Sequence, residues 1–246
     1  MRQGVFIEKC RSIFSDNDGV RYLPRQKFGP GLDVQRLALA DAGETQIFVK
    51  PEKRRYKDYK ICFVMDVSWS MDGSKIDILI QAVHAMTYAL TVAGASVFGI
   101  SFNADIEEVP YKTLFKLKEL STLLKSRLRT RGGCNRDGAA VKKAADMMLA
   151  LPKSPAKIIV VFSDGQPCCG SCHEPQGSVE AQLHQVRYLV KQIKDTRLKG
   201  LELLAVDIQE GECEAFYGKA KTVYIDKLES LYAKTMGLLE RNIRRG

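Results

Sequence analysis

The sequence predicts an α/β fold: a doubly wound, mainly parallel sheet with helices on both faces, preceded by a short N-terminal extension. Short apolar runs bounded by polar turns recur along the chain, and such runs are typical of strands buried on both faces. Segments of about 12 to 20 residues with helical periodicity separate them. Strands that alternate with helices of this length indicate βαβ units and a mainly parallel sheet.

The composition is that of a soluble globular protein of 246 residues, with 45% hydrophobic and 27% charged residues. No apolar run approaches the ~20 residues of a membrane helix, and the N-terminus lacks a secretory signal, so we expect a cytoplasmic protein without a membrane partner. The net charge of +9 indicates attraction to acidic surfaces, either nucleic acid or acidic protein segments.

The N-terminal part is weakly patterned up to about residue 28. We expect a short helix over Asp33–Ala42 and a short strand over Gln46–Val49, followed by a charged run from Glu52 to Lys60. The predicted domains are therefore an extension of residues 1–57, which packs on the rest, and an α/β domain of residues 58–246.

The central stretch is Ile61–Met71, with the sequence ICFVMDVSWSM. Its apolar half predicts a buried strand that ends at Asp66. Ser74 can then cap a long helix that continues to about Ala93, with Gly94 as its stop.

The next strands are expected at Ser96–Phe102 and, as a short edge strand, at Ile106–Val109. A basic amphipathic helix should follow over residues 113–129. Its inward leucines are Leu114, Leu117, Leu120, Leu123, Leu124 and Leu128. The loop Arg131–Gly138 leads into a helix that ends near Leu151.

The C-terminal part repeats the alternation of strands and helices. Strands are expected at Lys157–Ser163, Leu201–Ile208 and Thr222–Ile225. Helices are expected at about 178–196 and 227–243.

Oxygen-bearing side chains gather where these strands end. They are Asp66, Ser68 and Ser70 after the first strand, Asn135 and Asp137 in the glycine-rich loop, and Asp164 after the 157–163 strand. Parallel strands bring their carboxyl ends to one edge of the sheet. Each part alone is compatible with a simple turn, but together these hard oxygen donors predict a site for Mg²⁺, with Mn²⁺ or Ca²⁺ as alternatives.

The same residues carry a family resemblance. DVSWSM at 66–71, the GGCNRDGAA loop and FSDG at 162–165 resemble the metal-ion-dependent adhesion site (MIDAS) of von Willebrand factor A (VWA) domains, a Rossmann-like fold. The resemblance implies that Asp66, Ser68, Ser70, Asp137 and Asp164 hold the metal.

A narrower resemblance is to the C-terminal part of CobT-type cobaltochelatase subunits. It rests on GLDVQRLALA and IFVKPEKRRYKDY ahead of the central strand, on residues 137–140, and on AFYGKAKTVYIDKLESLYAKTM at 215–236. It implies a non-ATPase subunit that works with an AAA+ ATPase of the CobS or MoxR type and binds an acidic residue of a target protein. Such subunits also carry a further N-terminal extension, outside the part that this chain resembles, and an acidic linker. Neither is found here, so we expect a relative that serves another AAA+ machine.

The metal ligand from the glycine-rich middle loop could be Cys134, Asn135 or Asp137. We favour Asp137 because a carboxylate suits Mg²⁺ better than a thiol. Three carboxylates around a divalent ion leave a formal charge of minus one. Trp69, the only tryptophan, stands where glycine is usual in the family. It is a candidate partner contact, or its ring packs over the loop.

A second candidate site lies in the loop after Asp164. Its residues are Cys168, Cys169, Cys172 and His173, with Cys213 expected at the same edge of the sheet. Four ligands from this set could bind structural Zn²⁺; the alternatives are reduced cysteines or a redox-sensitive pair.

Catalysis by the chain alone is not expected, because no phosphate-binding loop and no Ser/His/Asp or Cys/His arrangement is legible. The sequence therefore favours a metal-dependent interaction module. The alternative is a basic nucleic-acid-binding accessory protein, based on the cations of the 113–129 helix and its flanks. These are Lys112, Lys116, Lys118, Lys125, Arg127, Arg129 and Arg131.

Overall fold

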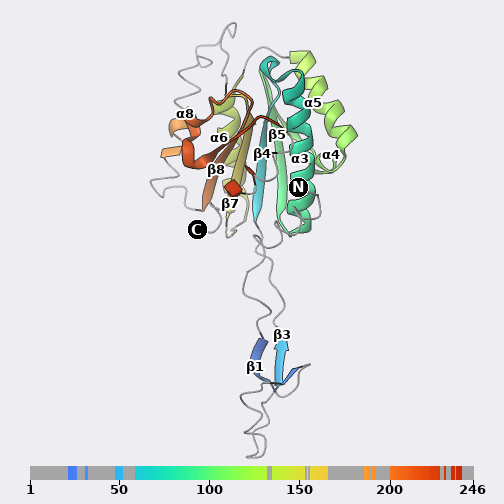
Figure 1. Ribbon diagram of the computed structural model, residues 1–246, viewed down its shortest axis with the longest axis vertical. Coiled ribbons are helices and arrows are strands. Elements are labelled where there is room, and N and C mark those ends of the chain that lie inside the picture. Colours follow the sequence, from blue (N-terminus) through green and yellow to red (C-terminus); the bar gives the residue numbers. More distant parts are fainter. Residues whose placement is uncertain are drawn as a thin grey trace, which may run out of the picture. The chain divides into compact units, whose positions relative to one another are not determined.

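Figure 1 shows the computed structural model of the chain. The structure describes residues 22–26, 31–32, 48–51, 59–131, 135–152, 154, 156–165, 186–188, 190–191, 200–227, 230, 234–235 and 237–239. It divides into two units, Ser15–Tyr56 and the remainder of the chain. The predicted domain boundary and the packing of the extension stay predictions.

The smaller unit contains a three-stranded antiparallel sheet in the order β1-β3-β2. Its strands are β1 (Tyr22–Gln26), β2 (Gly31–Leu32) and β3 (Phe48–Pro51). The weak pattern before residue 28 did not predict β1, which carries Pro24; β1 is an edge strand, where a missing N–H is tolerated. The predicted 46–49 strand continues to Pro51, and the predicted 33–42 helix lies outside the described residues.

The larger unit is built on a six-stranded sheet in the order β6-β5-β4-β7-β8-β9. Its strands are β4 (Lys60–Asp66), β5 (Ser96–Phe102), β6 (Ile106–Val109), β7 (Lys157–Ser163), β8 (Leu201–Ile208) and β9 (Thr222–Ile225). All pairs are parallel except β5 with β6. The predicted mainly parallel α/β sheet is confirmed.

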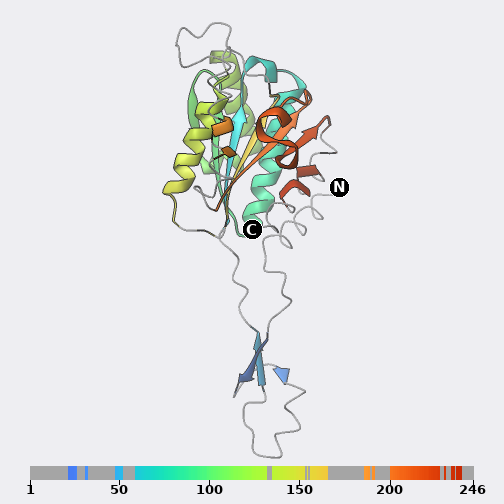
Figure 2. The same cartoon turned by 90° about the vertical axis from the view of Figure 1, so that its left-hand side faces the viewer.

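Helices cover both faces of this sheet. They are α3 (Ser74–Val92), α4 (Tyr111–Leu114) and α5 (Leu117–Arg131) on one face, and α6 (Asp137–Ala150) and α8 (Glu214–Tyr217) on the other (Figures 1 and 2). Short 3-10 turns lie at Trp69–Met71 and Lys219–Lys221. Only parts of the predicted 178–196 and 227–243 helices are described, and those parts contain helical residues. No helix within the described residues is long and apolar enough to cross a membrane.

Two local predictions were wrong. The predicted 113–129 helix is two helices, α4 and α5, which are separated at residues 115–116. Leu114, the last residue of α4, packs against Gly99, where an added Cβ would lie 3.0 Å from Leu114 Cδ2. Leu117 then faces solvent, with 44% of its surface exposed. Ser74 does not cap α3: Gly73 holds that position, and the Ser74 hydroxyl bonds Gln209 Oε1 instead, at 3.2 Å.

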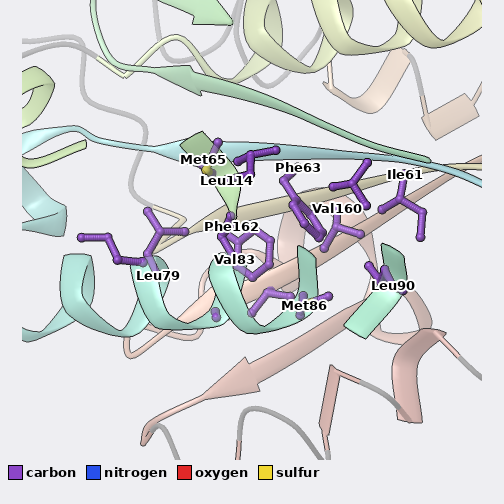
Figure 3. Close-up of a cluster of buried hydrophobic side chains, with 14 of the residues drawn as sticks. Ile61, Phe63, Met65, Leu79, Val83, Met86, Leu90, Leu114, Val160 and Phe162 are labelled. Carbon is purple, nitrogen blue, oxygen red and sulfur yellow. The ribbon is translucent and has the colours of Figure 1, made fainter. Parts of the chain in front are cut away.

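Alternating residues of the central strands fill two cores. Those that face α3 include Phe63 and Met65 of β4, together with Val160 and Phe162 of β7, and Figure 3 shows them packed against Leu79, Val83, Met86 and Leu90. The opposite face packs against α6. Phe63 and Phe162 meet edge to face, with ring centroids 5.7 Å apart. This double packing fixes the carboxyl ends of β4 and β7 in place.

Phe63→Ala should lower the free energy of unfolding by about 3–5 kcal/mol, because it leaves a cavity between the sheet and α3. Urea unfolding measures the loss. Tyr88→Ala, at a side chain that is 43% exposed, is the control and should change stability by less than about 1 kcal/mol. Equal losses in the two variants would contradict this description of the core.

Candidate metal centre

Three segments that are distant in sequence meet at the carboxyl edge of the sheet. Strand β4 ends at Asp66, and its parallel neighbour β7 ends at Ser163, one residue before Asp164. Asp137 is the first residue of α6, which packs on β4, β5 and β7. The predicted convergence of these side chains is therefore present in the fold.

The Asp66 carboxylate is fully buried and is fixed from three directions. Its Oδ1 accepts a hydrogen bond from the backbone N of Ser68 at 2.8 Å. Its Oδ2 accepts one from Asn135 Nδ2 at 2.9 Å and one from Ser163 Oγ at 2.8 Å. Of the three middle-loop candidates, Asn135 thus donates to Asp66, Asp137 lies buried beside it, and Cys134 is outside the described residues.

Burial and neighbouring negative charge disfavour the ionisation of Asp66 and Asp137. Burial raises the pKa of Asp66 to about 6, and the charge of Asp164 contributes to the rise. Burial also raises the pKa of Asp137 well above its ordinary value, with the charges of Asp66 and Asp164 acting in the same direction. A cation among these groups would favour their ionised forms.

The hydroxyls of Ser68 and Ser70 are the remaining candidate donors. Ser68 Oγ and Ser70 Oγ lie 3.0 Å apart. Adjacent ligands of an octahedral Mg²⁺ ion, bonded at 2.0–2.1 Å, are separated by about 2.9 Å. The two hydroxyls are thus spaced as neighbouring ligands of such an ion would be.

The donor set fits a small octahedral ion better than a large one. No group of three His, Cys, Asp or Glu side chains that could hold an ion occurs in the described part of the chain. The carboxylates of Asp66, Asp137 and Asp164 therefore do not form such a group by themselves, and the candidate donor set has to include the serine hydroxyl oxygens. Asp66 already accepts three hydrogen bonds, which leaves at most one lone pair and excludes bidentate binding in this arrangement. Ca²⁺ commonly uses bidentate carboxylates, whereas Mg²⁺ uses single oxygens and water.

Two polar contacts at this edge were not predicted. Ser163 Oγ bonds Asp66 and also accepts the backbone N–H of Gly165 at 3.1 Å. Lys75 Nζ lies 3.0 Å from Asp164 Oδ2 and 2.5 Å from Glu210 Oε1. Burial acts to lower the Lys75 pKa, but its bonds to Glu210 and Asp164 outweigh this and raise it. Neither contact has a sequence signal beyond its position beside a predicted ligand.

Gly165 lets two loops of the site touch. It has a φ of +77°, and an added Cβ would lie 2.7 Å from the backbone N of Cys213. That backbone N donates to Asp207 Oδ2 at 2.7 Å, while Cys213 Sγ donates to the carbonyl of Ser163 at 3.6 Å. The loop after β8 is therefore held against the residues that carry Asp164.

The zinc hypothesis rests mostly on residues outside the described part, since Cys168, Cys169, Cys172 and His173 all lie there. Cys213 is described and fully buried. Burial raises its pKa well above the ordinary value, which favours the thiol over the thiolate that binds zinc. The zinc site stays a prediction.

The exposed side of the centre carries Trp69, in the 3-10 turn directly after Ser68, with 65% of its surface exposed. Several predicted nucleic-acid contacts are instead paired with acidic groups. Lys116 bonds Glu119, Lys125 bonds Asp77 and Arg127 bonds Glu107. The basic helix is thus partly neutralised by its own neighbours.

Comparisons with known proteins agree with this fold. The family model described as von Willebrand factor type A domain matches residues 60–222. The pilus adhesin SpaC from Lactobacillus rhamnosus GG, in its open conformation, is similar with a TM-score of 0.55 and 14% identity, over 79% of this chain and 31% of that chain. This chain therefore spans about a third of the length of that adhesin.

Two further solved structures are similar over nearly their whole length. BatB, a conserved hypothetical protein from Bacteroides thetaiotaomicron, has a TM-score of 0.53 and 14% identity, over 76% of this chain and 100% of that chain. The vWF domain of the type V pili tip protein Mfa5 from Porphyromonas gingivalis has a TM-score of 0.52 and 10% identity, over 77% and 96%. At these identities the likeness shows the fold alone. No curated protein matches the sequence.

The metal-free protein should lose stability as the pH rises. Asp66 ionises near 3.8 in the unfolded chain and near 6 in the fold, so the folded state holds more protons between these values. Its contribution should fall by up to about 3 kcal/mol between pH 4 and pH 7, and added Mg²⁺ should restore it at pH 7.

Urea unfolding in EDTA, compared with Asp66→Asn at each pH, isolates this contribution. The difference in unfolding free energy between the two proteins should change across this pH range. If the difference in unfolding free energy were constant from pH 4 to pH 7, the pKa of Asp66 would not be raised by folding.

Proposed function

Because the chain belongs to the von Willebrand factor type A domain family, we propose that it is a protein-interaction module whose binding depends on a divalent ion. One observation carries the proposal. A cluster of buried carboxylates and two serine hydroxyls at the carboxyl edge lies directly beside the exposed Trp69. Tryptophan is enriched among the residues that contribute most to binding at protein interfaces.

The ion, Mg²⁺ or Mn²⁺, would be held by the five side chains that the resemblance implies. These are Asp66, Ser68, Ser70, Asp137 and Asp164. When bound, the ion supplies a Lewis-acidic position that can accept a carboxylate oxygen. The chain's own contribution is to fix the donors: Asn135 and Ser163 orient Asp66, and Gly165 holds the Asp164 loop against the next loop.

The partner in this proposal is a cytoplasmic AAA+ ATPase, with which the chain acts as a CobT-like adaptor, and the ion binds an acidic residue of the target. The support is the resemblance from about Phe28 to the C-terminus, together with the net charge of +9, which favours acidic partners. The chain itself is a non-catalytic component. Insertion of a metal into a tetrapyrrole is not part of the proposal.

Mg²⁺ binding is tested directly by calorimetry and by the fluorescence of Trp69, the only tryptophan. Asp66→Asn should weaken Mg²⁺ and Mn²⁺ binding at least tenfold, because it removes a buried negative charge. Asp77→Asn is a matched control, since Asp77 is half exposed and pairs with Lys125 on the outer surface. Equal affinity for Mg²⁺ in Asp66→Asn and the parent protein would refute the metal site.

Partner binding is tested by affinity purification of the tagged chain from its source organism, in Mg²⁺ and in EDTA. An AAA+ ATPase should be enriched in Mg²⁺ and lost in EDTA, and Trp69→Ala should reduce its recovery. Tyr88→Ala, at another exposed aromatic residue, should not. An ATPase retained equally in EDTA would overturn the metal dependence, and nuclease-sensitive recovery would favour the nucleic-acid alternative.

A further inference from the structure

A lysine is built into the edge of the candidate metal centre. Lys75 lies in the first turn of α3, and its side chain is only 14% exposed. Its ammonium nitrogen is 3.0 Å from Oδ2 of Asp164, whose side chain is fully buried. A cation of the chain itself therefore already contacts one of the carboxylates expected to hold the ion.

The same ammonium has a second partner nearer to solvent. Lys75 Nζ lies 2.5 Å from Oε1 of Glu210, which is 36% exposed. Glu210 follows Gln209, whose φ of +72° is unusual for a residue other than glycine. Lys75 thus bridges a buried carboxylate and a carboxylate at the surface.

The surroundings of Gln209 fix this geometry. The Gln209 side chain accepts a hydrogen bond from Ser74 Oγ at 3.2 Å and donates one to the carbonyl of Asp226 at 3.2 Å. Its backbone N donates to the carbonyl of Ile225 at 2.9 Å. The start of α3 and the loop after β8 are therefore joined, and Glu210 is held within reach of Lys75.

The positive charge of Lys75 would compete with a divalent ion for the same carboxylates. Asp66, Asp137 and Asp164 place three carboxylates at one buried edge, and Lys75 offsets part of that charge when no ion is bound. An ammonium and a divalent ion beside the same carboxylate repel each other. Glu210 is a second carboxylate within reach of the ammonium, nearer to the surface. Lys75 can therefore move away from Asp164 and still have an anionic partner.

We propose that Lys75 is the internal counter-cation of this site: it pairs with Asp164 in the metal-free protein, competes with the divalent ion, and has Glu210 as its alternative partner when the ion is bound. The inference rests on the proposed function only in that the site binds a divalent ion. It needs neither the AAA+ ATPase nor an acidic target.

Lys75→Met should therefore bind Mn²⁺ at least fivefold more tightly than the parent protein, because the competing charge is gone. In EDTA the same variant should unfold at a lower temperature, because Asp164 loses its counter-charge. Lys75→Arg, which keeps the competing positive charge, should not tighten Mn²⁺ binding as Lys75→Met does, although its planar guanidinium differs in shape from the ammonium.

Glu210→Gln should have the opposite effect on affinity. Of its two anionic partners among the described residues, the ammonium then keeps Asp164 alone, so Mn²⁺ should bind at least threefold more weakly. In the double variant Lys75→Met/Glu210→Gln, the Glu210 change should have little further effect, because Glu210 acts through Lys75. This double-mutant cycle separates Glu210's action through Lys75 from its own attraction for the ion.

The experiment is titration of the full chain with MnCl₂, followed by calorimetry and by the electron paramagnetic resonance of free Mn²⁺, with thermal unfolding in EDTA. If the parent protein binds no Mn²⁺, the proposed function fails at its metal site. If the parent binds Mn²⁺ but Lys75→Met binds it equally or more weakly, the counter-cation inference is overturned.

The double-mutant cycle gives a further decisive outcome. An equal Glu210→Gln effect in both backgrounds would remove Glu210 as the alternative partner of Lys75. If Lys75→Met does not fold in EDTA, Lys75→Gln replaces it for the affinity measurement. Glu210→Gln changes an exposed residue, so it tests independently whether loss of the alternative partner weakens Mn²⁺ binding.

Discussion

The carboxyl edge of the sheet depends on keeping one carboxylate, that of Asp66, in a position without solvent contact. Burial opposes its ionisation, so the fold surrounds it with donors from three segments: the turn at Ser68, the loop residue Asn135 and the end of β7 at Ser163. Each donor fixes a different part of the chain relative to β4. The hydrogen bonds that offset the burial of Asp66 therefore also assemble the site. Each segment that donates a hydrogen bond to Asp66 also brings the candidate metal ligands next to that donor into place.

The rigidity of this arrangement comes from the layers beneath it. β4 is paired on both sides, with β5 and β7, and is packed against α3 on one face and α6 on the other. Side chains at the ends of such strands are positioned more accurately than side chains on long loops, which suits recognition by an ion with strict octahedral geometry. The 3-10 turn that follows β4 exposes the ring of Trp69 to solvent beside this fixed base.

The four central strands of the larger sheet, β4, β5, β7 and β8, were predictable because apolar runs bounded by turns indicate burial on both faces without any need for tertiary detail. The edge strands β6 and β9 were predicted as short strands without such a run. The break between α4 and α5 was not predictable, since it depends on the space beside Gly99, a residue on another element. The acidic candidate ligands could be found from their places after strands. Ser163 and Lys75 could not be assigned roles, because their contacts with Asp66 and Asp164 span 97 and 89 residues. The spacing of the glycine-rich loop likewise did not decide between Asn135 and Asp137 as the candidate ligand. The fold distinguishes their positions: Asn135 donates a hydrogen bond to Asp66, whereas Asp137 is a second buried carboxylate.

The edges of the larger sheet determine how another protein can approach it. β6 and β9 are its two outermost strands, each is four residues long, and β6 carries Glu107 and Glu108. The shortness of both strands, and the charges on β6, discourage a foreign strand from extending the sheet by backbone pairing. A partner that cannot dock by strand addition is restricted to side-chain and loop surfaces, where specificity is set by a few groups rather than by a generic hydrogen-bond ladder.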